Sequence, residues 1–179
     1  MTLKWEVSGE PKIFKVSPRG RLKWSPSSAE SGEPLRFYGS SPRRLVLVVQ
    51  ASSGDGLDLG CGLGGHETDV LLASDGRSAL DLLRQHHASI SSLVTDTALR
   101  EPLSGLMLPF WFRFYNPFGP VIYLSDDPGD EFGTVQYSAV LRRACPAGEL
   151  MREILLIEEE VRAAHTHDAR IAGWSLSGS

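Results

Sequence analysis

The chain has 179 residues, enough for one compact domain with an extension or two, and its hydrophobic fraction of 41% supports a packed core. The formal net charge of -4 provides no basic surface for nucleic acid or an anionic membrane, and two cysteines exclude both a disulfide framework and a four-thiolate metal site. The N-terminus lacks the apolar core of a signal peptide, and no stretch reaches the ~18 apolar residues of a membrane span. We therefore expect a soluble, cytoplasmic protein with no nucleic-acid or membrane partner.

Residues 1–43 form an arm rich in Ser, Pro, Gly and Arg, with short apolar bursts at 3–5, 13–16 and 22–24. Turn formers separate the bursts, so this arm can close a short β-meander, and its second half has the composition of a linker. Three short strands without a partner surface are marginally stable. We expect an irregular N-terminal extension that is either loosely ordered or docked on another surface.

From residue 44 onward, strand-like apolar runs alternate with helical patterns. The aliphatic run 45–49 suits a strand buried on both faces of a parallel sheet. Apolar positions three and four residues apart predict a helix that is capped by Ser74 or Asp75, and a longer closing helix after Pro146 with Glu158 and Arg162 paired on its outer side. The predicted strands are 45–49, 70–73, 90–95, 120–124 and, more weakly, 135–141. This order predicts a doubly wound, five-stranded parallel sheet over residues 44–163, followed by a C-terminal tail at 164–179.

The stretch GLDLGCGLGG at residues 56–65 resembles the first motif of S-adenosylmethionine-dependent methyltransferases, whose glycines let the backbone approach a ligand closely. Only four residues separate Gly65 from the next strand, whereas a crossover between parallel strands needs a dozen or more. A helix here would lose roughly 0.8–1 kcal/mol for each glycine relative to alanine. The preferred interpretation is an eroded first crossover. A methyltransferase that uses the Gly60–Gly65 loop, through Gly60 and Gly62, together with Asp75 is the alternative from another functional class.

Four segments in chain order carry a second resemblance. They are residues 71–83 with an Asp-Gly turn before a helix, residues 93–96 followed by 102–106, residues 120–125, and residues 141–150. On these segments, the chain from about 45 to 157 resembles the receiver domain of two-component response regulators. The resemblance implies a flavodoxin-like fold and a signalling role in a phosphorelay, rather than an enzyme.

The resemblance also implies a phosphoryl site. Asp96 stands at the position of the phospho-acceptor, and Ser125 and Arg143 stand where the family has the hydroxyl and the lysine that contact the phosphoryl group and act as a switch. Arg143 replaces a compact ammonium with a wide planar fork. We expect Arg143 to pair with Asp96 and to hold the site in a permanently charge-satisfied state.

In the receiver family, Mg²⁺ is held by an acidic pair after the first strand together with the acceptor aspartate. Gln50 and Ala51 occupy the positions of that pair, and neither is a charged oxygen ligand. A magnesium ion would bind Asp96 only with help from Asp55 or Asp58. We therefore expect no resident cofactor, with weakened Mg²⁺ binding as the remaining possibility.

Residues 106–118 contain six aromatic side chains, more than one buried helix face can take. They predict an exposed partner surface that includes Phe110, Trp111, Phe114 and Tyr115. The third and fourth helices, like the first, should be eroded. We expect a degenerate receiver-like module that contacts a histidine kinase or another signalling protein; a homodimer, and a conventional single-domain regulator phosphorylated on Asp96, both stay open.

Overall fold

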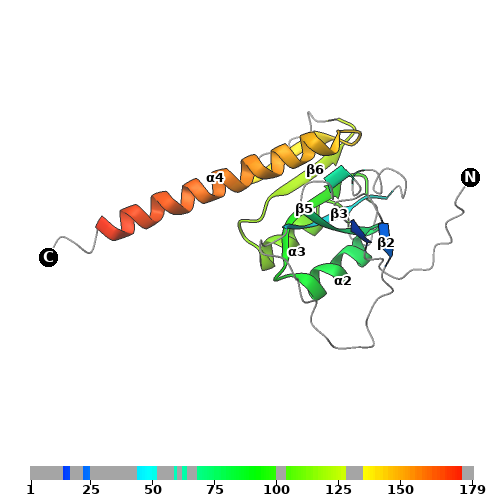
Figure 1. The fold of residues 1–179 in the computed structure, drawn as a ribbon, viewed down its shortest axis with the longest axis horizontal. Coiled ribbons are helices and arrows are strands. Elements are labelled where there is room, and N and C mark those ends of the chain that lie inside the picture. Colours follow the sequence, from blue (N-terminus) through cyan, green and yellow to red (C-terminus); the bar gives the residue numbers. More distant parts are fainter. Residues whose placement is uncertain are drawn as a thin grey trace, which may run out of the picture.

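The structure, a computed structural model, describes residues 14–16, 22–24, 44–51, 59, 62–63, 68–99, 104–127 and 135–174. Its centre is a five-stranded parallel sheet in the order β4-β3-β5-β6-β7 (Figure 1). The strands are β3 (Arg44–Val49), β4 (Thr68–Ala73), β5 (Ile90–Asp96), β6 (Val121–Ser125) and β7 (Ser138–Arg142). This is the flavodoxin-like order, and it confirms the predicted fold class.

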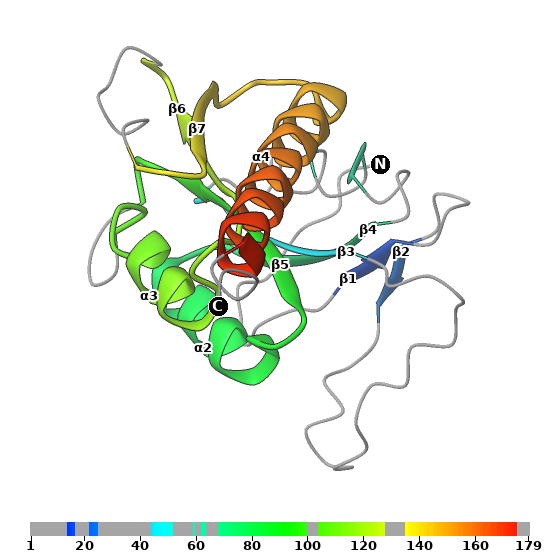
Figure 2. The same ribbon diagram turned by 90° about the vertical axis from the view of Figure 1, so that its left-hand side faces the viewer.

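Helices cover both faces of the sheet because its central strands are apolar on both sides. In β3, Leu45, Leu47 and Val49 join a core cluster with helices α2 (Gly76–His86) and α3 (Leu108–Tyr115). The alternate residues Val46 and Val48 join a second cluster with helix α4 (Ala147–Trp174). Figure 2 shows α2 and α3 side by side, with α4 crossing the other side of the sheet. Alternating side chains of a continuous aliphatic strand therefore supply two separate cores.

Helix α2 begins at the predicted cap. Asp75 has an extended backbone, and its Oδ1 accepts a hydrogen bond of 2.8 Å from the backbone N–H of Ser78. Ala79, Leu82 and Leu83 then turn one apolar face into the core. The cap and the apolar stripe together fix both the start and the orientation of this helix.

Helix α3 forms as a regular helix of 8 residues in spite of the aromatic crowding around it, so the expected erosion of the third helix is wrong. Pro109 lies in its first turn, and Phe112 is buried in the core. At its other end the Arg113 guanidinium donates to the carbonyl oxygen of Tyr137 over 2.9 Å. Tyr137 has a φ of 59°, so this contact holds a left-handed turn directly before β7. The predicted erosion of a fourth helix concerns the segment between Ser125 and Val140, and residues 128–134 of that segment lie outside the described part of the chain.

Helix α4 lies along the sheet and then runs past it. Its buried stripe includes Leu150, Ile154 and Ile157, as the sequence pattern predicts. Glu158 pairs with Arg44 at the start of β3, with 3.0 Å between Oε2 and Nε, instead of with Arg162 as we expected. The sequence does not show this partner because the two residues are far apart along the chain.

The C-terminal part of α4 occupies the segment for which the sequence indicated a tail. The helix continues to Trp174 and projects beyond the sheet (Figure 1). Four alanines between 163 and 172 favour this continuation, because alanine has the highest helix propensity. None of the described helices combines the length and apolar character of a bilayer-spanning segment.

Within the N-terminal arm, β1 (Phe14–Val16) and β2 (Leu22–Trp24) pair in antiparallel fashion. Strand β1 lies against β4 at the edge of the large sheet (Figure 2). These strands coincide with two of the three apolar bursts, and the burst at 3–5 lies outside the described residues. The described part of the arm, this hairpin, is therefore docked at the edge of the sheet.

We predict that Asp75→Ala lowers the free energy of unfolding by about 1 kcal/mol, because the first turn of α2 loses its cap. Burial raises the pKa of Asp75, but hydrogen bonds from Ser78 and Ser74 outweigh burial and lower it below its ordinary value of 3.8. The stabilisation is therefore present above that value and is lost as the pH falls through the lower pKa of the folded state.

Urea unfolding followed by circular dichroism measures both effects. Asp81→Ala is the matched control, since Asp81 lies on the same helix and makes only an exposed contact with Arg84. A loss for Asp75→Ala no larger than that of the control would show that the cap does not contribute.

Candidate functional site

Polar side chains gather at the carboxyl ends of the parallel strands. Asp96 ends β5, Ser125 ends β6, Gln50 follows β3 and Arg143 follows β7. Asp96 lies opposite Leu124, and the backbone N–H of Arg143 donates to the carbonyl oxygen of Ser125 over 3.0 Å. The register of the sheet thus brings the predicted positions to one edge, the edge at which open α/β sheets bind ligands.

Asp96 is fully buried, with 0% of its side chain exposed. Its Oδ1 accepts a hydrogen bond of 2.8 Å from the backbone N–H of Ala98 and lies 3.1 Å from Nη2 of Arg143. The expected ion pair is therefore present. Among the described residues, the second oxygen, Oδ2, has no hydrogen-bond partner.

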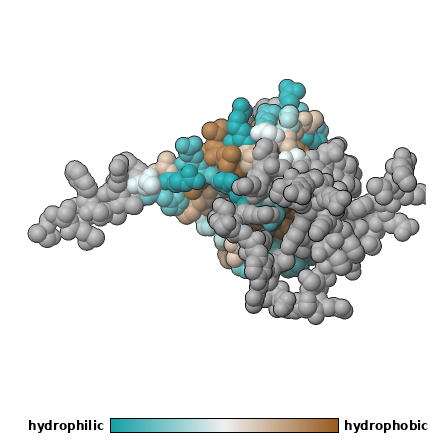
Figure 3. Space-filling view, in the orientation of Figure 1, coloured by the Kyte–Doolittle hydropathy of each residue, from teal (hydrophilic) through white to brown (hydrophobic). Residues whose placement is uncertain are grey.

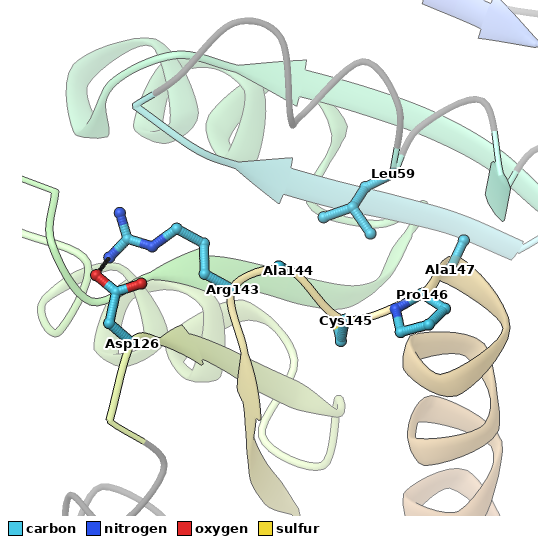
Figure 4. A pocket seen from close by; sticks show the side chains of 7 residues that line it. All are labelled: Leu59, Asp126, Arg143, Ala144, Cys145, Pro146 and Ala147. Atoms are coloured by element: carbon cyan, nitrogen blue, oxygen red, sulfur yellow. Dashed lines mark ion pairs between the residues drawn. The ribbon is translucent and has the colours of Figure 1, made fainter.

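Arg143 also binds a second carboxylate, which the sequence analysis did not include. Its Nη2 lies 3.1 Å from Oδ2 of Asp126, a residue whose side chain is 80% exposed (Figure 4). One guanidinium therefore bridges a buried and an exposed acid. The available signal was the position of Asp126 directly after the strand-ending Ser125.

The backbone around Asp96 is fixed by a close approach of Gly105. A Cβ added at Gly105 would overlap the carbonyl oxygen of Asp96, so only glycine fits here. The Thr95 hydroxyl donates to the carbonyl oxygen of Gly105 over 3.3 Å. The segment before α3 thus packs directly on the end of β5 and limits the movement of the Asp96 main chain.

The Ser125 hydroxyl is bound within its own turn. Its Oγ donates to the carbonyl oxygen of Asp127 over 3.0 Å and accepts from the N–H of Asp127 over 3.2 Å. Ser125 is buried, and its position at the end of β6 places it next to the ion pair between Asp96 and Arg143. A group that entered the site would have to compete with these two local hydrogen bonds.

At the positions of the acidic pair, Gln50 is buried and Ala51 is exposed. The backbone N–H of Gln50 donates to the carbonyl oxygen of Ala73, which continues the β3–β4 pairing by one residue. Neither atom of its side-chain amide has a hydrogen-bond partner within the described structure. A buried amide with unmet hydrogen bonds is costly, typically by about 1–3 kcal/mol, so Gln50 is the least satisfied residue of this edge.

Comparison with solved structures identifies the fold. A response regulator receiver protein from Sinorhizobium medicae is 22% identical, with a TM-score of 0.60, and the match covers 66% of this chain and 96% of that one. A receiver domain protein from Clostridium thermocellum is 21% identical with a TM-score of 0.59, over 68% and 98% of the two chains. The fold is that of a response regulator receiver domain. No protein-family model and no curated protein matches the sequence.

Two further structures with the receiver fold are informative for their context. A CheX–CheY complex with BeF3 and magnesium from Borrelia burgdorferi is 14% identical, with a TM-score of 0.55 over 64% of this chain and 88% of that chain. The receiver domain of the hybrid histidine kinase CckA is 20% identical, with a TM-score of 0.54 over 63% and 97%. Receiver domains thus occur both in complexes and within larger kinases.

The described residues at this edge of the receiver fold do not suit Mg²⁺. Magnesium prefers carboxylate oxygens and water, but Asp96, the buried carboxylate at this edge, already binds a guanidinium, and Gln50 offers a neutral amide. No cluster of three His, Cys, Asp or Glu side chains that could hold a metal ion occurs in the described part of the chain. Asp55 and Asp58, the other candidate ligands, lie outside it.

A pocket of about 380 Å³ adjoins the ion pair. It is lined by Leu59, Asp126, Arg143, Ala144, Cys145, Pro146 and Ala147. Figure 4 shows the Arg143 guanidinium directed to Asp126, away from Cys145 and the start of α4. Burial, followed by the nearby Glu149 charge, raises the pKa of the Cys145 thiol, so this cysteine remains a neutral lining group.

The methyltransferase alternative gains no support from the receiver fold. Leu59 and Leu63 lie in short helical turns that are buried with α4, not in a central strand. A Cβ at Gly62 would overlap the side chain of Ala147, so this glycine serves close packing. Asp75 caps α2. Gly60 lies outside the described residues.

The structure divides the four predicted partner-surface aromatics into two pairs. Phe110 and Phe114, four residues apart on α3, are 69% and 74% exposed. Trp111 packs against the core cluster, and the Tyr115 ring lies 5.0 Å from the ring of His87. The two phenylalanines are therefore the part of this set that is free to meet a partner.

We predict that Arg143→Ala lowers the free energy of unfolding by about 3 kcal/mol, because it leaves the buried Asp96 carboxylate unpaired. Adding Asp96→Asn should recover most of this loss, which a double-mutant cycle in urea would measure. Arg142→Ala is the control, since Arg142 is the exposed neighbour at the end of β7. Equal effects of Arg143→Ala and Arg142→Ala would contradict a stabilising pair.

For α3, Phe112→Ala should cost about 3–5 kcal/mol in unfolding free energy, as expected for a buried phenylalanine. Phe110→Ala and Phe114→Ala should each change it by less than about 0.5 kcal/mol, because both rings are mostly exposed. Thermal or urea unfolding of the three variants distinguishes them. A large loss of unfolding free energy on substitution at position 110 or 114 would mean that these rings stabilise the fold and are not available to a partner.

Proposed function

We propose that this chain is a degenerate receiver module of two-component phosphorelay signalling, which acts by protein–protein contact and not as an enzyme. The observation that supports this most is the position of one guanidinium between Asp96 and Asp126. The site already contains a cation that neutralises the acceptor carboxylate. A module of this kind would work in the cytoplasm.

Phosphoryl transfer to a carboxylate needs a free acceptor oxygen and positive charge on the incoming phosphoryl oxygens. Here the positive charge of Arg143 is shared between two acids. Gln50 adds no charge, and the Ser125 hydroxyl is engaged by the Asp127 backbone. Each of these features favours a site that holds one state over a site that switches.

The partner we propose is a histidine kinase or another signalling protein. Among proteins of this fold, the CckA receiver is a precedent for association with a histidine kinase, and the CheX–CheY complex is a precedent for contact with another protein. Phe110 and Phe114 supply exposed aromatic area of the kind that is enriched in protein interfaces. Signal output would then depend on contacts at α3.

One observation favours a second candidate, a conventional regulator phosphorylated on Asp96. The Oδ2 atom of Asp96 has no hydrogen-bond partner among the described residues, so one acceptor oxygen is unoccupied. In this alternative Arg143 would release Oδ1 and contact the phosphoryl group. Mg²⁺ would then need ligands from outside the described residues.

Beryllofluoride with Mg²⁺, which mimics a phosphoryl group, tests the proposal. We expect the amide spectrum of the wild-type chain to show no shifts around Asp96, whereas a variant with Gln50→Asp and Ala51→Asp, which restores two acids, should show them. Asp96→Asn in both backgrounds is the control. Saturable shifts in the wild-type chain that disappear with Asp96→Asn would favour the conventional regulator.

A further inference from the structure

Two adjacent leucines on α4 face away from the sheet. Leu155 and Leu156 are 40% and 52% exposed, although Ile154 and Ile157 on either side of them are buried. In Figure 3 hydrophobic surface gathers over the middle of this helix. The buried stripe of α4 attaches the helix to the sheet, and neither Leu155 nor Leu156 belongs to that buried cluster.

Opposite charges flank the two leucines at equal distances. Arg152 lies about one turn before their midpoint and Glu159 about one turn after it, and both are exposed on the same outer face. Arg152 has an ion pair of 3.2 Å with its neighbour Glu153, but such an exposed pair is weak and leaves the guanidinium available. The outer face of α4 therefore reads Arg, Leu-Leu, Glu from its N-terminal side.

We propose that this face binds the same face of a second copy, with the two α4 helices antiparallel. An antiparallel pair centred between Leu155 and Leu156 places leucines against leucines. It also places Arg152 of each copy opposite Glu159 of the other, because the two residues are equally distant from the centre. A parallel pair would bring like charges together, so the charge pattern selects the antiparallel, two-fold arrangement.

This dimer goes beyond the proposed signalling role, and the two are independent. Helix α4 covers one face of the sheet and α3 covers the other, so pairing through α4 leaves Phe110 and Phe114 uncovered. The contact is a single helix pair, small in comparison with stable interfaces. The association should therefore be weak and dependent on concentration.

Sedimentation equilibrium of the full-length chain over a range of concentrations tests the proposal. We expect a reversible dimer. Arg152→Glu and Glu159→Arg should each raise the dissociation constant of the dimer by about tenfold or more. The double charge swap should return it to within about threefold of the wild-type value. Arg84→Glu, the same charge change at an exposed site on α2, is the matched control and should have no effect.

Three outcomes would overturn the proposal. A wild-type chain that is monomeric at all concentrations would leave this face to a different protein. A dimer that tolerates both single reversals must form through another surface. A double swap as weak as the single variants would exclude the cross-pairing of residues 152 and 159. Circular dichroism confirms that the exposed substitutions preserve the fold, so none of these results would reflect unfolding.

Discussion

The guanidinium of Arg143, bound to two carboxylates, determines the character of this site. A buried ionised carboxylate is expensive without a partner, and Asp96 at the end of β5 has no exposed surface. Arg143 reaches it only because β6 and β7 are in register and carry it to the same edge. Asp126, in the turn after β6, binds the same nitrogen from the solvent side. The ends of three neighbouring strands of the sheet are thereby connected through one side chain.

At this edge of the sheet the buried carboxylate of Asp96 already has a cationic partner. The close approach of Gly105 fixes the Asp96 main chain, and the Ser125 turn is closed by its own hydrogen bonds. Exposed apolar groups lie elsewhere, on α3 and on the outer side of α4, and these helices cover opposite faces of the sheet. In the degenerate module that we propose, the receiver fold would keep its scaffold and its contact surfaces while the phosphoryl site holds one state.

The sequence predicts the local features of this structure better than it predicts the contacts between residues that are far apart along the chain. The aliphatic run in β3, the Asp75 cap and the buried stripe of α4 depend on neighbouring residues, and the sequence predicts them closely. The pairing of Glu158 with Arg44 joins residues 114 positions apart, and the contact of Asp126 depends on the β6–β7 register. Such partners are set by the assembled sheet, so a single sequence does not reveal them. The alanines after residue 162 were a local sign that α4 continues, but we expected a tail in this segment.

The state of the Arg143 guanidinium in solution tests the central claim most directly. Nitrogen-15 NMR of its side chain, assigned with Arg143→Lys, reports how freely the group rotates and whether its environment changes. Our account predicts a restricted guanidinium whose signals are unchanged by excess Mg²⁺, because the ion pair with Asp96 excludes the metal. Signals of a freely rotating group, or a release of the group when Mg²⁺ binds Asp96, would contradict it.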